Sequence, residues 1–129
     1  NTLVADSTKL LELRASWKGS FNRILIDAPC SGLGTLARHP DARWRITPAK
    51  IDELILLQGA LLEGLLPLLA PRGRIVYSTC TIHPKENSER ISSLLSSYPE
   101  LTLISEEQLW PGENKINDGF YAAVMQFNP

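Results

Sequence analysis

The sequence predicts an α/β fold in which short strands alternate with helices around a layered sheet. Two short apolar runs, residues 23–27 and 75–78, have the length and composition of buried strands. Between them, residues 48–69 place their leucines and isoleucines on one face of a helix. A helix that joins two neighbouring strands in this way makes them parallel, with a right-handed crossover.

The composition fits one domain with a buried core and excludes several other classes of protein. The chain has 129 residues, 43% of them hydrophobic, and a formal net charge of −1. Such a chain is neither a disordered segment nor a strongly basic nucleic-acid clamp. No apolar run approaches the roughly 18 residues of a membrane span. Two cysteines are too few for a disulfide framework or a cysteine-based zinc site, so we expect a reducing, cytoplasmic setting and no metal.

The first part of the chain predicts one full strand and one long loop. We expect residues 3–5 to be a stub of strand that ends at Asp6, and residues 7–15 to form a weak helical turn or two. Residues 23–27 are mostly apolar, which predicts a parallel strand buried on both faces. Residues 28–45 contain two prolines and two glycines, so we expect a long loop, which in a compact domain is often functional.

The second part predicts two helices and three strands. Thr47-Pro48 is a helix start, with a hydroxyl cap followed by a proline in the first turn. The apolar stripe that follows is interrupted at Gln58, and the helix ends before Pro71-Arg72-Gly73. The remaining predicted elements are a strand at 75–78, a helix that Pro84 opens and Pro99 closes, a strand at 101–104 and a strand at 119–127.

Reactive side chains follow the predicted strands, and ligands of such sheets bind at the carboxyl ends of their strands. Cys30 lies just beyond Asp27, and Cys80 just beyond the strand at 75–78. Because neighbouring parallel strands end at the same edge of a sheet, we expect the two cysteines to lie close enough to share a pocket. The alternative for each cysteine is a small buried hydrophobic residue.

Five motifs carry a family resemblance. Asp27-Ala28-Pro29-Cys30-Ser31-Gly32 is followed by Ser78-Thr79-Cys80-Thr81, with 53 positions from Asp27 to Cys80. The others are R-H-P-D and a tryptophan within residues 36–44, P-K-E-N-S-E at 84–89 and D-G-F-Y-A-A at 118–123. In this order they resemble the Sun/NSUN-type RNA cytosine-C5 methyltransferases, over essentially the whole chain. The most similar group within that family is the bacterial one that methylates RNA of the small ribosomal subunit.

The resemblance implies the C-terminal half of a Rossmann-like class I methyltransferase fold that depends on S-adenosylmethionine. That family's mixed, mostly parallel sheet has the strand order 3-2-1-4-5-7-6, so this chain would hold a remnant of strand 3 and strands 4 to 7. Residues 1–129 would then be a partial catalytic domain, without the glycine-rich cofactor turn and the N-terminal RNA-binding module. We expect such a fragment to be inactive alone, and to self-associate through the exposed edge of the strand at 23–27.

The resemblance also implies a mechanism for three residues. Cys80 matches the family's nucleophile, which adds to C6 of cytosine and makes C5 able to accept a methyl group. Cys30 matches the second cysteine, which assists release of the covalent adduct. Asp27 matches a carboxylate that contacts the base, and we also expect it at the cofactor. Asp6 matches an aspartate that hydrogen-bonds the adenine of S-adenosylmethionine, although a lone aspartate after a strand is more often a turn residue.

The expected macromolecular partner is RNA, with ribosomal RNA of the small subunit as the main expectation. Arg38, Arg43, Trp44 and Arg45 lie in the predicted long loop and would contact phosphates and stack on a base. The alternative is a solvated loop with Trp44 packed inward. For the whole chain, the alternatives are a transfer RNA cytosine-C5 methyltransferase and a non-catalytic RNA-binding or assembly module. A DNA cytosine methyltransferase fits less well, since its nucleophile is the cysteine of the Pro-Cys motif.

Overall fold

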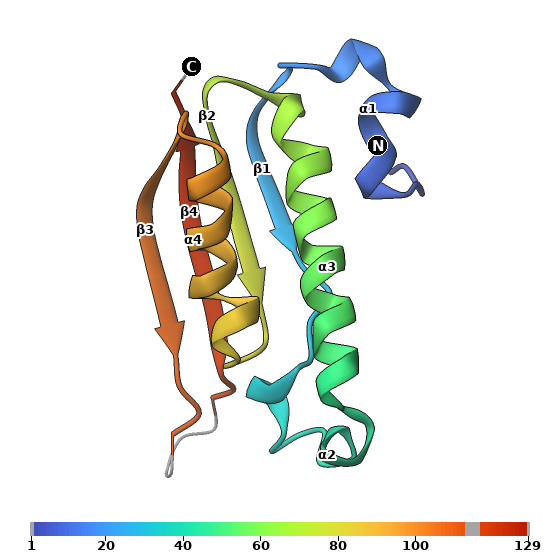
Figure 1. The fold of residues 1–129 in the computed structure, drawn as a ribbon, viewed down its shortest axis with the longest axis vertical. Coiled ribbons are helices and arrows are strands. Elements are labelled where there is room, and N and C mark those ends of the chain that lie inside the picture. The colour runs from blue at the N-terminus through green and yellow to red at the C-terminus, as the bar shows by residue number, and fades with distance from the viewer. Residues whose placement is uncertain (1, 113–116, 129) are drawn as a thin grey trace.

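The computed structural model describes residues 2–112 and 117–128, which form one sheet with helices against it (Figure 1). The strands are β1 (Phe21–Asp27), β2 (Leu69–Thr79), β3 (Leu101–Leu109) and β4 (Phe120–Phe127). The α-helices are α1 (Leu10–Leu13), α2 (Ala42–Arg45), α3 (Pro48–Leu65) and α4 (Ser88–Ser97).

The strand order is β1-β2-β4-β3. β1 and β2 are parallel and joined by α3, whereas β4 runs antiparallel to both β2 and β3. Three of the four strands therefore point the same way, and their carboxyl ends lie at the lower end of Figure 1. This order equals the 4-5-7-6 part of the sheet that the family resemblance predicts, so that prediction is confirmed.

α3 begins and ends close to where the sequence predicts. The Thr47 hydroxyl accepts a hydrogen bond from the Lys50 amide at 3.2 Å, and Pro48 occupies the first turn. Pro67 falls in the 3-10 turn Leu66–Leu68 that follows the helix. Gln58, which interrupts the apolar stripe, is fully buried rather than exposed. A polar side chain in that position needs hydrogen-bond partners. The side-chain nitrogen of Gln58 has two in the candidate site, whereas its side-chain oxygen is buried without one.

The core lies between the sheet and the two long helices. Ile75, Tyr77 and Met125 of the sheet are fully buried, as is Leu62 of α3, while Ile91 of α4 is 1% exposed. Alternation along the strands positions this core, because every second side chain faces the helices. The loops at the carboxyl ends of β1 and β2 therefore start from strands that are packed against this core.

Four local predictions differ from the structure. Residues 3–5 form no strand. β1 is buried on one face only, since Leu25 is 71% exposed. β2 starts at Leu69 rather than Ile75. Its pairing with β1 shifts register between Phe21 and Arg23, so that residues 70–73 of β2 bulge without ending the strand. The predicted strand at 101–104 continues to Leu109.

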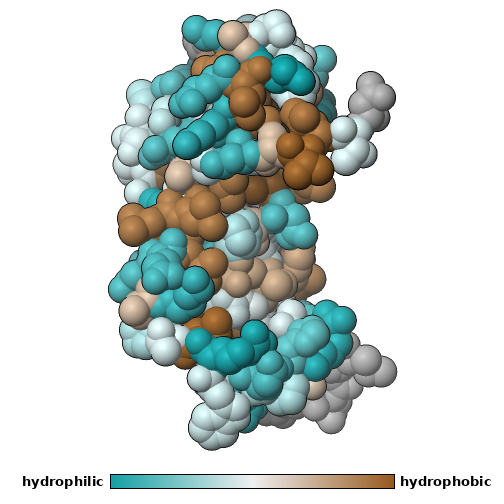
Figure 2. Space-filling model, turned by 90° about the vertical axis from the view of Figure 1, so that its right-hand side faces the viewer, coloured by the Kyte–Doolittle hydropathy of each residue, from teal (hydrophilic) through white to brown (hydrophobic). Residues whose placement is uncertain are grey.

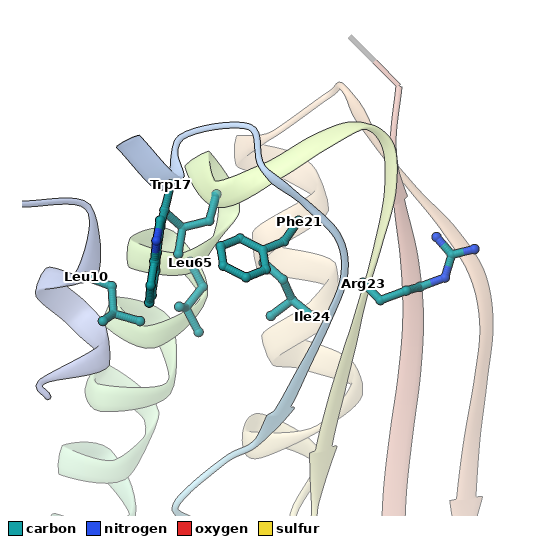
Figure 3. Close-up of a pocket in the computed structure, with 7 residues that line it drawn as sticks. Leu10, Trp17, Phe21, Arg23, Ile24 and Leu65 are labelled. Atoms are coloured by element: carbon teal, nitrogen blue, oxygen red, sulfur yellow. The ribbon is translucent and has the colours of Figure 1, made fainter. Parts of the chain in front are cut away.

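An apolar hollow of about 200 Å³ lies at the opposite end of β1 from the cysteines. Leu10, Trp17, Phe21 and Leu65 point toward one another across it, while Arg23 points away (Figure 3). The rings of Trp17 and Phe21 meet edge to face at 5.4 Å. None of the residues that line this hollow is one of the candidate site residues.

The side of the molecule beside α1 and α3 carries hydrophobic residues, which Figure 2 shows gathered mainly in its upper half. β1 is the outer strand there, as predicted from the resemblance. Association of the chain through this edge stays a prediction. Among the described residues, no helix is both long enough and apolar enough to cross a membrane.

Candidate active site

The two cysteines lie side by side beyond the ends of β1 and β2. Asp27 pairs with Ser78 in the parallel register, and the Ala28 amide still donates to the Ser78 carbonyl at 2.9 Å. The two segments that follow β1 and β2 therefore leave the sheet side by side. The Cys30 and Cys80 sulfur atoms are 3.4 Å apart. Both thiols are free and half-buried. The expectation that the two cysteines meet at one edge of the sheet is confirmed.

The surroundings of Cys30 favour its protonated form. Burial, followed by the hydrogen bond and charge of the neighbouring Cys80, raises the pKa of the Cys30 thiol to about 12. At neutral pH Cys30 is thus a thiol that can donate a hydrogen bond to Cys80. A second sulfur atom lies directly beside this thiol, so the two can divide the work of attack and release between them.

Asp27 ends β1 with its side chain exposed to solvent. The Ser78 hydroxyl lies 3.4 Å from one carboxylate oxygen and donates to the Ile26 carbonyl at 3.2 Å. Asp27 and Asp6 both line a hollow of about 440 Å³, and so does Pro29, the residue before Cys30. The two residues expected at the cofactor therefore share one concave surface.

Asp6 is also a turn residue, as the alternative interpretation has it. Its Oδ1 accepts hydrogen bonds from the Thr8 amide at 3.0 Å and from the Thr8 hydroxyl at 2.7 Å. These bonds, the hydroxyl first, lower the pKa of the Asp6 carboxyl, so the group is ionised at neutral pH. Both bonds fall on Oδ1, and the side chain is exposed to the shared hollow.

The expected RNA-binding residues are exposed and lie around α2. Trp44 is 88% exposed, so the alternative that it packs inward is wrong. Arg45 lines a second hollow of about 350 Å³ that also contains Cys30. Arg45 forms an ion pair with Asp41 at 2.6 Å, and Arg38 pairs with Asp118. The predicted loop at 28–45 therefore contains the helix α2 and carries its charges beside the cysteines.

Gly34 ties this loop to the turn that carries Cys80. Its amide donates to the Cys80 carbonyl at 3.0 Å, and its carbonyl accepts from the Gly119 amide at 2.8 Å. A Cβ at position 34 would overlap the Gly119 carbonyl and lie 2.8 Å from the Cys80 carbonyl oxygen. The glycine is needed here because three backbone segments meet with no room for a side chain.

Sequence reasoning missed one feature of the candidate site, the buried polar residues next to the cysteine-bearing loops. Glu86 is fully buried and accepts hydrogen bonds from Ser31, Gln58 and Thr81. The signal was present, since Gln58 interrupts an otherwise apolar helix face and Glu86 lies in one of the five motifs. Among the described residues, no group of three or more metal-binding side chains gathers at this site or elsewhere.

Solved structures identify the class of protein to which this fold belongs. A methyltransferase homolog from Pyrococcus horikoshii matches with a TM-score of 0.76 and 28% identity, over 95% of this chain and 43% of its own. NSun6 from the same organism, crystallised with SFG, matches with a TM-score of 0.80 at 22% identity, over 100% of this chain and 35% of its own. The fold is the Rossmann-like fold of methyltransferases that depend on S-adenosylmethionine.

The sequence narrows this class to one family. The model of the family described as 16S rRNA methyltransferase RsmB/F matches residues 2–126, and the chain belongs to this family. The ribosomal RNA small subunit methyltransferase B of Vibrio vulnificus (strain YJ016) is 40% identical over 116 residues. That match covers 84% of this chain and 27% of the relative, so the chain spans about a quarter of that protein's length.

Proposed function

We propose that this chain carries the catalytic cysteines of an RNA cytosine-C5 methyltransferase that uses S-adenosylmethionine and acts on 16S ribosomal RNA. It works as part of a longer catalytic domain. The observation that carries the proposal is the pair of thiols 3.4 Å apart at the carboxyl ends of two parallel strands. Membership of the 16S rRNA methyltransferase family supports the choice of RNA.

In this proposal Cys80 is the nucleophile and Asp27 the group that contacts the base. C5 of cytosine is a poor nucleophile until a thiolate adds to C6. The sulfur of Cys80 forms a bond to C6, and the electron pair of the C5–C6 double bond becomes available at C5. Asp27, three residues before Cys30, shares a proton with N3 so that negative charge does not build up in the ring.

Cys30 assists the release step. After C5 has been methylated, the C5 proton leaves to a base and its electron pair restores the C5–C6 double bond. The bond between Cys80 and C6 breaks, and Cys80 departs as a thiolate. The Cys30 thiol, held protonated by its raised pKa, donates a hydrogen bond to that thiolate at the 3.4 Å spacing. This division of roles agrees with the different surroundings of the two sulfur atoms.

The hollow shared by Asp6 and Asp27 fits S-adenosylmethionine, which when bound supplies the methyl group. The cofactor carries amino and hydroxyl donors, and both residues offer carboxylate acceptors on one concave surface of about 440 Å³. Asp6 is ionised and can accept from the adenine amino group. NSun6 was crystallised with SFG, an analogue of this cofactor, which supports the assignment.

RNA would approach from the side of α2. Arg43 and Trp44 are exposed there, and Arg45 lines the hollow that contains Cys30. Guanidinium groups position RNA through its phosphates, and an exposed indole can stack on an unpaired base. The target cytosine must leave its stack to reach the cysteines, and such a pairing of charge with an aromatic ring suits that task.

The test is methyl transfer by a complete enzyme that carries these residues, with methyl-labelled cofactor and two substrates, 16S ribosomal RNA and transfer RNA. We expect label at C5 of a cytosine in 16S RNA, and none when Cys80→Ser replaces the nucleophile. Label in transfer RNA alone would contradict the choice of substrate. RNA binding that survives both cysteine substitutions, without any methyl transfer by the unmodified protein, would show a non-catalytic module instead.

A further inference from the structure

We propose that Glu86 is a positioning residue that holds both cysteine-bearing loops and thereby sets the spacing of the two thiols. The inference rests on the proposed function, because that function gives the spacing its purpose. Glu86 is the last residue of the 3-10 turn Pro84–Glu86 between β2 and α4, and its carboxylate contacts the loops that leave β1 and β2.

The residues that directly follow the two cysteines bind the same carboxylate. Ser31 follows Cys30, and it donates its amide to Glu86 Oε1 at 2.8 Å and its hydroxyl to Oε2 at 2.5 Å. Thr81 follows Cys80, and its hydroxyl lies 3.2 Å from the same Oε2. The Ser31 and Thr81 hydroxyl oxygens are also 2.8 Å apart. One carboxylate thus joins two loops that lie 50 positions apart in the sequence.

Gln58 connects this carboxylate to the residue before Cys30. Its side-chain nitrogen donates to Glu86 Oε1 at 3.1 Å and to the Pro29 carbonyl at 2.9 Å. The residues on both sides of Cys30 are therefore held in place. Ser31 binds Glu86 directly, and Pro29 binds Gln58, which in turn binds Glu86. Because Gln58 belongs to α3, the loop is also anchored to a long helix.

Asn87 holds Cys80 from both sides in a similar way. Its side-chain oxygen accepts from the Thr79 hydroxyl at 2.6 Å, and its side-chain nitrogen donates to the Thr81 carbonyl at 2.9 Å. The Tyr77 hydroxyl donates to the Glu86 carbonyl at 2.8 Å, which fixes the backbone of this pair. Glu86 and Asn87 therefore act together, but only Glu86 reaches the loop that carries Cys30.

The burial of Glu86 makes these contacts strong. The side chain is fully buried, and none of the ion pairs among the described residues involves it. A buried carboxylate is costly unless hydrogen bonds satisfy it, and four donor groups do so here. Replacing the carboxylate by an amide removes the charge from all four hydrogen bonds. With the amide nitrogen at the Oε2 position, the Ser31 and Thr81 hydroxyls must also turn from donors into acceptors.

The first test measures how well the chain holds its two thiols together. In this chain, which has two cysteines, glutathione disulfide oxidises the pair to a disulfide and is itself reduced to two glutathione thiols. The equilibrium gives the effective concentration of one thiol at the other. We expect Glu86→Gln to lower it by about tenfold, as loss of charged hydrogen bonds would. Glu89→Gln, at an exposed position on the first turn of α4, should leave it unchanged.

Circular dichroism checks that each variant folds. If Glu86→Gln does not fold, Thr81→Val replaces it in the same measurement. Valine has the shape of threonine and keeps the carboxylate, but removes the link from Glu86 to the Cys80 loop. We expect its effective concentration to fall as well. An effective concentration equal to that of the unmodified chain, in a folded variant, would overturn the proposal.

The second test separates positioning from a general loss of stability. In a complete enzyme that carries these residues, Glu86→Gln should lower kcat by about tenfold and change KM for RNA by less than about twofold. A matching rise in KM with kcat unchanged would contradict the proposal. If the unmodified enzyme methylates no RNA, the proposed function fails, while the thiol equilibrium still decides whether Glu86 positions the cysteines.

Discussion

Two groups of side chains lie at the same end of the sheet, but the protein holds them in opposite ways. Cys30 and Cys80 are fixed by buried hydrogen bonds that converge on Glu86 and by the backbone contact at Gly34. The basic segment, residues 38–45, exposes its three arginines and Trp44 to solvent, and both members of its Arg45–Asp41 ion pair are exposed. Exposed pairs of this kind contribute only about 0–1 kcal/mol.

This difference indicates that the proposed reaction uses a fixed site for the chemistry and an adaptable surface for binding RNA. The spacing of the two sulfur atoms is set before any substrate arrives, because the hydrogen bonds from both loops to Glu86 are buried. The basic segment can rearrange when RNA binds, because little holds its side chains in place. Substitutions in the two regions should therefore have different consequences, one for the stability of the fold and the other for RNA affinity.

The largest expected effect is on the rigid region. Gly34→Ala puts a Cβ against the Gly119 and Cys80 carbonyls, so we expect the free energy of unfolding to fall by about 3 kcal/mol. Urea unfolding of the chain measures this. Gly59→Ala is the matched control, because its Cβ would meet only the movable end of Arg90 and alanine favours the helix. Equal losses in the two variants would show that the contact at Gly34 is not special.

The rigid region also shows what sequence reasoning could and could not predict. The sheet order followed from the family resemblance, and the meeting of the two cysteines followed from the two strand runs that precede them. Glu86 was not predicted as a functional residue because its role depends on three segments, at 29–31, 58 and 81, whose convergence only the fold creates. The extension of β3 to Leu109 was missed because its residues are polar, as an outer strand allows.

A smaller effect should appear in the exposed region, and only in RNA binding. Trp44→Ala removes a side chain that is 88% exposed, so the stability of the fold should hardly change. Loss of stacking on one base weakens RNA affinity by about 1–3 kcal/mol, or roughly five- to 150-fold. Filter binding of a complete enzyme that carries these residues to 16S RNA measures this, with Trp110→Ala, another exposed tryptophan, for comparison. Unchanged affinity in Trp44→Ala would remove this residue from the proposed RNA surface.

The smallest expected effect is on how the stability of the fold depends on pH, and it arises in the rigid region alone. The folded chain binds the Cys30 proton more tightly than the unfolded chain does, because burial and Cys80 raise the thiol pKa from its ordinary 9.0 to about 12. Stability from this group is therefore complete below about pH 9 and is lost as the pH rises toward 12. The raised pKa values of Tyr77 and Tyr121 act in the same direction.

Cys30→Ser isolates the contribution of the thiol. We expect its unfolding free energy, measured in urea at intervals from pH 8 upward, to fall less steeply with pH than that of the unmodified chain. A residual slope should remain, because both tyrosines are still present. Parallel curves for the two proteins would mean that Cys30 titrates alike in the folded and unfolded chain.

The central claim is that Cys80 attacks the base and Cys30 helps to release it, and one measurement tests both halves. A complete enzyme that carries these residues, with Cys30→Ser, is incubated with 16S RNA and cofactor, and the mixture is separated on a denaturing gel. We predict a covalent protein–RNA complex, with mass spectrometry placing the nucleotide on Cys80. A complex that forms with Cys80→Ser instead, linked through Cys30, would contradict the account.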